Sequence, residues 1–121
     1  MAKILVVDDD PIAVLAAQQF FIGEGYEVLA AGDGLSALDI ARNERPDLIM
    51  LDLMLPKLDG FEVCNMLKSD EKFQSMKIIM FTGRKDEESL KTGREVGADA
   101  YLVKGCGPKR VLEEVHRLLK T

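Results

Sequence analysis

Three uninterrupted runs of apolar residues stand out along the chain, at residues 4–7, 48–51 and 78–81. Strands that are apolar on both faces are typical of a parallel sheet covered by helices on each side, whereas strands that face water alternate. Residues 27–31 and 100–103 form shorter or more mixed runs. The pattern therefore predicts three central strands and two less buried ones.

Helical patterns separate these runs. The first opens with Asp10 as a helix N-cap and Pro11 in the first turn, and it ends at Gly23 or Gly25. Further helices are predicted over residues 35–44, after Gly60, over residues 87–96 and after Pro108. The apolar positions that share a stripe are Ile12, Leu15, Ala16 and Phe20 in the first helix, Phe61, Cys64 and Leu67 in the third, and Val111, Leu112, Val115, Leu118 and Leu119 in the last.

The fourth predicted helix has a weak apolar stripe. Its only large apolar residues are Leu90 and Val96, among many charged residues. Little burial would then hold it against the sheet, so we expect this helix to be the most mobile one.

A strand followed by a helix, five times over, predicts an α/β fold. Right-handed crossovers arrange such units as an open, doubly wound parallel sheet. We expect five strands in the order 2-1-3-4-5 with five flanking helices, a flavodoxin-like architecture. At 121 residues and 47% hydrophobic, the chain is long enough for one domain with a real core.

The charge balance excludes some classes of partner. Sixteen basic residues against 21 acidic ones give a net charge of −5, which argues against binding to nucleic acid or to anionic membranes. No apolar run is long enough for a membrane helix or a signal peptide, so we expect a cytoplasmic protein. Cys64 and Cys106 have no metal-site spacing, and His116 is the only histidine. Any chemistry must then depend on other side chains.

Polar residues follow four of the predicted strands directly. They are Asp8, Asp9 and Asp10 after the first strand, Asp52 after the third, Thr82 after the fourth and Lys104 after the fifth. Ligands of such sheets bind at the carboxyl ends of the strands, so we expect these side chains to converge. Asp10 is interpreted as a helix cap, because it precedes Pro11.

Clustered carboxylates need cations, because two unit charges about 4 Å apart repel by roughly 4 kcal/mol near a protein surface. Lys104 supplies one positive charge, and Mg²⁺ suits the remainder because it prefers carboxylates, waters and a phosphate. Phosphoryl transfer uses these same parts. Asp52 is the predicted nucleophile, Asp8 and Asp9 the predicted metal ligands, and Thr82 and Lys104 the predicted partners of the phosphoryl oxygens.

These motifs resemble the receiver domain of response regulators in two-component signalling, the CheY-like family. The matching blocks are Val6-Val7-Asp8-Asp9, Leu51-Asp52 with Met54-Leu55-Pro56 and Asp59-Gly60, Phe81-Thr82, and residues 98–104, Ala-Asp-Ala-Tyr-Leu-Val-Lys. The resemblance runs from about Lys3 to Leu119. It implies that residues 1–121 are one receiver domain, with no output domain in this chain.

The resemblance also implies a role for each site residue. Asp52 would accept a phosphoryl group from a sensor histidine kinase or phosphotransfer protein. Asp9 and Asp52 would bind Mg²⁺ directly, Asp8 through water, and the main-chain carbonyl of Met54 would complete the protein ligands. Lys104 would contact the acyl phosphate.

Signalling would then follow from two residues, as the resemblance implies. Thr82 would move toward the phosphoryl group, and Tyr101 would rotate inward, altering the face made by the fourth helix, fifth strand and fifth helix. That face would bind a downstream effector. The domain would be a monomer or a phosphorylation-dependent dimer, and not a multiple-turnover enzyme.

Three further residues lie near the predicted site in the sequence. Gly105 replaces the proline that usually follows the lysine, which predicts either a looser trans loop or a strained exception. Cys106 lies between two glycines, where a bystander residue is the simpler interpretation than a reactive thiol. Met54 is apolar, and we hypothesise that it shields an acyl phosphate from water.

Other functions fit parts of the same pattern. A haloacid-dehalogenase-like phosphatase also uses Asp, Mg²⁺, Thr and Lys, but Ile12, two places beyond the acid pair Asp8 and Asp10, is atypical of that family, and such enzymes usually have a longer chain and a cap. A flavodoxin-like cofactor domain would place phosphate where Asp8, Asp9 and Asp10 repel it. An unphosphorylated docking module would have no need of mutually repelling acids.

Overall fold

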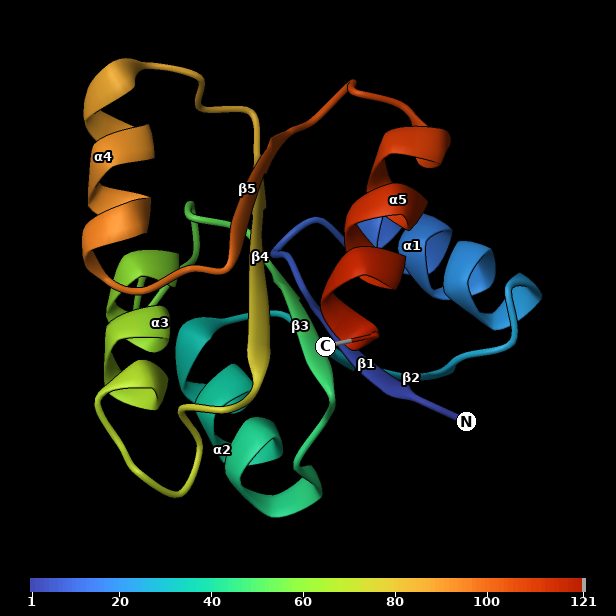
Figure 1. Ribbon diagram of the computed structural model, residues 1–121, viewed down its shortest axis with the longest axis horizontal. Helices are drawn as coiled ribbons and strands as arrows, with labels where there is room; N and C mark the ends of the chain where they lie inside the picture. The colour runs from blue at the N-terminus through green and yellow to red at the C-terminus, as the bar shows by residue number, and fades with distance from the viewer. Residues whose placement is uncertain (121) are drawn as a thin grey trace.

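Five strands, each followed by a helix, alternate along residues 1–120, the part of the chain that the computed structural model describes (Figure 1). The strands are β1 Lys3–Val7, β2 Glu27–Ala31, β3 Leu48–Leu51, β4 Lys77–Thr82 and β5 Ala100–Val103. The helices are α1 Pro11–Gly23, α2 Gly34–Glu44, α3 Gly60–Lys68, α4 Glu87–Glu95 and α5 Pro108–Leu119. All strand pairs are parallel, in the order β2-β1-β3-β4-β5. The predicted fold is confirmed.

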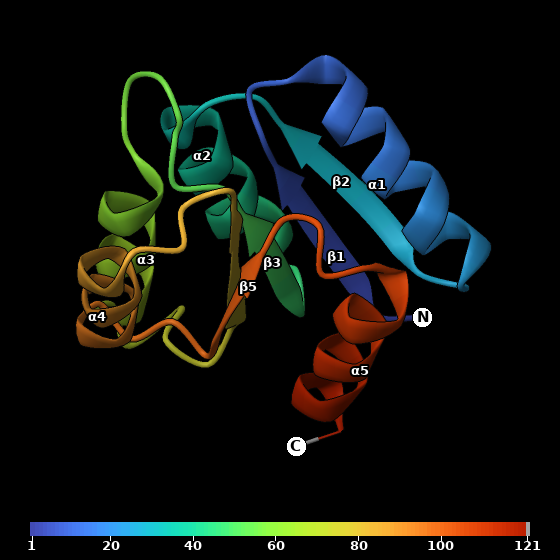
Figure 2. The ribbon, with the colours of Figure 1, turned by 90° about the horizontal axis from the view of Figure 1, so that it is seen from above.

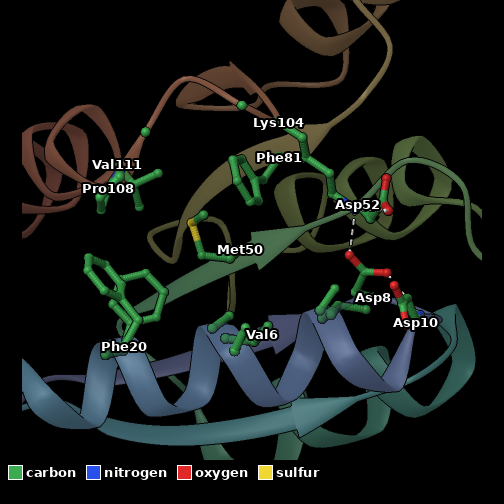
Figure 3. A pocket seen from close by; sticks show the side chains of 17 residues that line it. Val6, Asp8, Asp10, Phe20, Met50, Asp52, Phe81, Lys104, Pro108 and Val111 are labelled. Carbon is green, nitrogen blue, oxygen red and sulfur yellow. Dashed lines mark hydrogen bonds and ion pairs between the residues drawn. The ribbon is translucent and has the colours of Figure 1, made fainter.

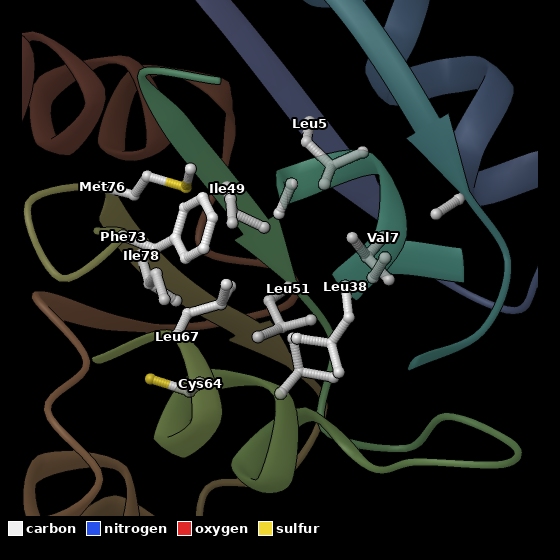
Figure 4. Close-up of a cluster of buried hydrophobic side chains, with 14 of the residues drawn as sticks. Leu5, Val7, Leu38, Ile49, Leu51, Cys64, Leu67, Phe73, Met76 and Ile78 are labelled. Atoms are coloured by element: carbon white, nitrogen blue, oxygen red, sulfur yellow. The ribbon is translucent and has the colours of Figure 1, made fainter. Parts of the chain in front are cut away.

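Alternate residues of the central strands enter two separate cores, one on each face of the sheet. Figure 2 shows α2 and α3 on one side of the sheet and α1 and α5 on the other. Leu5, Ile49 and Ile78 point to the face covered by α2 and α3, which we call the α2–α3 core (Figure 4). Ile4, Met50 and Ile79 point to the opposite face, covered by α1 and α5, which we call the α1–α5 core. The apolar runs in the sequence follow from this, because both faces are buried.

Aspartates begin four of the helices. The side chains of Asp10, Asp33, Asp59 and Asp86 each accept a backbone N–H of the first helical turn, satisfying a donor that has no partner inside the helix. The first helix starts and ends as predicted, from Pro11 to Gly23. Among residues 1–120, no helix combines the length and apolar character that crossing a membrane requires.

The predicted apolar stripe of α1 is wrong at three of its four residues. Ile12 is 79% exposed, Leu15 is 54% exposed and Ala16 is exposed as well, so only Phe20 is partly buried as expected; Phe21, outside the predicted stripe, is the buried residue. Residues 11–23 contain no charged side chain and have only Gln18 and Gln19 as polar ones, so the sequence gives little information on which face of the helix meets solvent. Successive side chains point about 100° apart around a helix. When Phe21 points toward the core, Ile12 and Leu15 therefore point away from it.

The fourth helix forms as predicted, with small buried residues. Ser89 and Gly93 are the buried positions of α4, while Leu90 is only half-buried. Little apolar surface therefore attaches α4 to the rest of the molecule. Its mobility stays a prediction.

Candidate functional site

Two buried carboxylates lie side by side at the carboxyl edge of the sheet. Val7 and Leu51 are partners in neighbouring strands, so the residues that follow them, Asp8 and Asp52, emerge together. Both are nearly inaccessible, at 7% and 6% exposure, while Asp9 is exposed. One oxygen from each of these three acids lies within 4.8 Å of the others. The predicted acidic cluster therefore exists.

Lys104 joins the two buried acids. Its ammonium lies 2.7 Å from Asp8 Oδ2 and 3.0 Å from Asp52 Oδ2. Partial burial lowers the pKa of Lys104, but its hydrogen bonds to the two carboxylates outweigh this, and the net pKa is raised. The lysine is therefore firmly charged at neutral pH and offsets part of the repulsion between the acids.

The loop that carries Lys104 turns without a proline. The backbone N–H of Lys104 donates to the Thr82 carbonyl at 2.8 Å, which fixes the lysine beside the end of β4. Gly105 and Gly107 then take positive φ angles of 99° and 93°, and no peptide bond within residues 1–120 is cis. Of the two expectations for Gly105, the trans loop is the one observed, and it still delivers the lysine to the acids.

Backbone amides hold the other oxygen of each buried acid. Asp10 donates its N–H to Asp8 Oδ1 at 3.0 Å, and Met54 donates its N–H to Asp52 Oδ1 at 3.3 Å. Each carboxylate is thus fixed between a backbone donor and Lys104. Sequence reasoning missed these amides, since a backbone group leaves no residue-type signal.

Thr82 and Tyr101 are connected through the backbone of Arg84. Thr82 is fully buried, and its Oγ1 accepts the Arg84 N–H at 3.3 Å. The Tyr101 hydroxyl donates to the Arg84 carbonyl at 2.7 Å. Burial, together with the negative charge of Asp86, raises the pKa of the Tyr101 hydroxyl, so it stays a protonated donor. A contact of Thr82 with a phosphoryl group stays a prediction.

The donor set suits a hard divalent cation. Three carboxylates lie together with one lysine beside them, so negative charge is in excess. One oxygen from each acid lies within 4.8 Å of the other two, a separation near the roughly 4 Å between two ligand oxygens on opposite sides of Mg²⁺. Carboxylate oxygens are the donors that Mg²⁺ prefers. The role of the Met54 carbonyl in metal binding stays a prediction.

An open cavity of about 550 Å³ leads from the acids along the space between α1 and α5 (Figure 3). Asp8, Asp52 and Lys104 lie at one end of it, with Val6 and Met50 beside them and Phe20 farther along. The α1 wall consists largely of alanines. The site is therefore accessible along the space between α1 and α5, as well as from the loops that follow the strands at this edge of the sheet.

Four singled-out residues remain, two cysteines, a histidine and Met54. Cys64 is buried in the α2–α3 core, and burial raises the pKa of its thiol to about 12, which confirms it as a core residue. His116 is exposed, as predicted. Cys106 is exposed, and its thiol lies 3.8 Å from the Gly107 carbonyl. Met54 is 59% exposed, with its sulfur 3.9 Å from an Arg84 nitrogen.

Comparison with known proteins gives a consistent result. The family described as response regulator receiver domain matches residues 4–116. The chain is 43% identical to the alkaline phosphatase synthesis transcriptional regulatory protein PhoP of Bacillus subtilis and 40% identical to the DNA-binding response regulator MtrA of Mycolicibacterium smegmatis. Each match covers 98% of this chain, but only 48% of PhoP and 50% of MtrA. The chain thus spans about half the length of these curated relatives.

Solved structures agree with the fold. The chemotaxis protein CheY4 of Vibrio cholerae superposes with a TM-score of 0.91 at 33% identity, covering 98% of both chains. A structure described as the BeF3-activated DrrB receiver domain gives a TM-score of 0.89 at 33% identity, covering 100% of this chain and 99% of the other.

Proposed function

This chain belongs to the response regulator receiver family, and from that premise we propose that Asp52 accepts a phosphoryl group from a sensor histidine kinase or phosphotransfer protein. A carboxylate oxygen of Asp52 attacks the phosphorus of a phosphohistidine. The phosphorus–nitrogen bond breaks, the imidazole leaves, and Asp52 becomes an acyl phosphate.

The observation that carries this proposal is the ammonium of Lys104 between Asp8 and Asp52. A scaffold gains nothing from two buried, mutually repelling acids, whereas phosphoryl transfer needs a fixed nucleophile and a cation on the transferred oxygens. Lys104 contacts Asp52 Oδ2, so a phosphoryl group on that oxygen would arrive within its reach. Thr82, at the end of the next strand, is the proposed second donor.

The acids are the proposed Mg²⁺ site. Asp9 and Asp52 would hold the ion directly, Asp8 through water, and the Met54 main-chain carbonyl would complete the protein ligands. Bound there, Mg²⁺ supplies positive charge that offsets the negative charge of the acids and of the incoming phosphoryl oxygens. Backbone N–H groups already hold one oxygen of Asp8 and of Asp52 in place.

Thr82 and Tyr101 are the proposed switch. When Thr82 turns toward a phosphoryl group on Asp52, its hydrogen bond from Arg84 is disturbed, and the Arg84 carbonyl is the acceptor of Tyr101. Movement of Tyr101 then changes the surface formed by α4, β5 and α5. Weak burial of α4 makes this surface the easiest to alter.

The surface of α4, β5 and α5 is proposed to act on a downstream effector protein or domain, in a cytoplasmic, phosphorylation-dependent pathway. PhoP and MtrA are named as regulators of transcription or DNA binding, but this chain matches only about half of each. We propose that residues 1–121 receive the signal and do not themselves bind nucleic acid, in keeping with their charge of −5. The proposed domain is a monomer or dimerises on phosphorylation.

Acetyl phosphate with Mg²⁺ tests the proposal. We expect mass spectrometry to show one phosphoryl increment per chain, lost in Asp52→Asn and on removal of Mg²⁺ by a chelator. Asp39→Asn, which changes an exposed aspartate on α2, is the matched control and should still be labelled. An increment that persists in Asp52→Asn would contradict the assignment of the acceptor. Many turnovers of an added phosphomonoester would instead support a phosphatase.

Met54 is proposed to shield the acyl phosphate from water. Its side chain lies at the rim of the site beside Arg84. Replacing Met54 with Asn introduces a group that can orient water near the phosphorus, so we expect faster loss of the phosphoryl increment. An unchanged rate of hydrolysis in Met54→Asn would exclude the shielding role.

A further inference from the structure

The ring of Tyr101 lies directly on the backbone of α4. A Cβ atom at Gly93 would lie 3.0 Å from Tyr101 Cδ2 and 3.5 Å from Cε2, the first of these well inside the roughly 3.5–4.0 Å at which carbon atoms pack best. We infer that Gly93 is a positioning residue for Tyr101: its missing side chain lets the ring lie against α4, where the hydroxyl reaches the Arg84 carbonyl.

The backbone of α4 gives no other reason for a glycine at this position. Gly93 has no positive φ angle, so any residue could adopt its helical conformation. A glycine in a helix interior is less favourable than an alanine, and α4 has little apolar burial to compensate. A packing contact is one physical reason for a glycine inside a helix, and here the nearest neighbour is the ring of Tyr101.

The contact at Gly93 extends the chain of bonds that starts at Thr82. Thr82 Oγ1 accepts the Arg84 N–H, and the Arg84 carbonyl accepts the Tyr101 hydroxyl. The Tyr101 ring then rests on Gly93, so the four residues connect the end of β4 to α4 without a gap. The inference rests on the proposed function, since Gly93 would determine whether a change at Asp52 reaches α4 through Tyr101.

Tyrosine NMR tests the inference directly, because the chain has only two tyrosines and no tryptophan. In Gly93→Ala, with ring-labelled tyrosine, we expect the Tyr101 resonances to shift while those of Tyr26, on the other side of the molecule in the α1–α5 core, stay in place. Acetyl phosphate should still label Asp52. The shift of Tyr101 on phosphorylation should fall by about half or more, because phosphorylation can bias only a ring position that the protein can adopt.

Gly23→Ala is the matched control, because a Cβ there would meet nothing within 4 Å. The Tyr101 resonances should stay unchanged in this variant.

If Gly93→Ala alone does not fold, Gly93→Ala combined with Tyr101→Ala should fold, because the obstructing ring is gone. Unmoved Tyr101 resonances in Gly93→Ala, a full-size response to phosphorylation, or a double variant as unstable as the single one would each overturn the inference. Failure of the unmodified protein to take a phosphoryl group would overturn the proposed function, while the resonance comparison between the unmodified protein and Gly93→Ala would still stand.

Discussion

The two faces of the sheet are filled to different degrees. In the α2–α3 core, Val63, Cys64 and Leu67 of α3 are fully buried. Gly34, at the start of α2, lets the backbone of α2 lie against the backbone of Leu58. On the other face a cavity of about 550 Å³ remains between α1 and α5, and Ile12 and Leu15 stay exposed. The same strands supply large apolar residues to both faces, so the covering helices decide how closely each face is packed.

The candidate site lies where these two regions meet. Lys104 reaches the acids on the loop that borders the open cavity, whereas Tyr101 packs against the α2–α3 core. A group that approaches Asp52 can therefore enter without disturbing the closely packed side. Thr82, in contrast, is connected through the backbone of Arg84 to Tyr101, which packs against the α2–α3 core. The cavity beside Asp52 thus lies on the α1–α5 face, while Tyr101 packs on the opposite face.

Leucine truncation should give the largest contrast between the faces. Leu67 is fully buried in the α2–α3 core, whereas Leu15 on α1 is 54% exposed. Leu67→Ala removes buried methyl groups and leaves a cavity, so it should lower the free energy of unfolding by about 2–5 kcal/mol. Leu15→Ala should change it by no more than about 0.5 kcal/mol. Urea unfolding at equal m-values measures both, and equal losses would contradict the assigned difference in packing.

Adding volume should reveal the same contrast on a smaller scale. Ala41 on α2 is fully buried, while Ala13 on α1 lines the cavity. Ala41→Leu has no space to occupy and should cost about 1–3 kcal/mol in overpacking. Ala13→Leu can extend into the cavity, so its effect should stay within about 0.5 kcal/mol of zero. Urea unfolding midpoints measure both variants, and equal losses of stability would contradict open space beside Ala13.

Strand positions and the site acids could be predicted because they leave strong sequence signals. Four apolar residues in a row have few alternatives to a buried strand, and Asp8 and Asp52 follow such runs directly. The orientation of α1 could not be predicted, because residues 11–23 are uncharged and apolar residues occur all round the helix. Hydrogen bonds made by backbone groups, such as the Arg84 carbonyl with Tyr101, carry no residue identity and so left no signal.

The contact between Gly93 and Tyr101 could not be predicted from the sequence, for a related reason. A glycine among charged residues on a weak helix gives no indication of its neighbour, and Tyr101 lies eight positions further along the chain. The two meet where α4 packs beside β5. Lys104 illustrates the opposite case, since its place at a strand end was sufficient to predict its contacts even without the expected proline.

The two cysteines offer the mildest probe of the contrast, because labelling them need not disturb the fold. Cys64 lies in the α2–α3 core with a thiol pKa raised by burial to about 12, whereas Cys106 is exposed on the loop that follows β5. The thiolate is the reactive form, and with a pKa near 12 only about one Cys64 thiol in ten thousand is ionised at pH 8. Iodoacetamide at pH 8 should therefore add one label to the native protein and two in urea, with none on native Cys106→Ser.

The same raised pKa of Cys64 makes the stability of the α2–α3 core depend on pH. Because the unfolded thiol ionises first, near the ordinary value of 9.0, the stabilising effect of the neutral Cys64 is complete below pH 9 and is lost as the pH rises toward 12. Labelling at pH 8 thus probes the core while this effect is intact. Two labels on the native protein at pH 8 would show that the α2–α3 core opens more readily than its packing indicates.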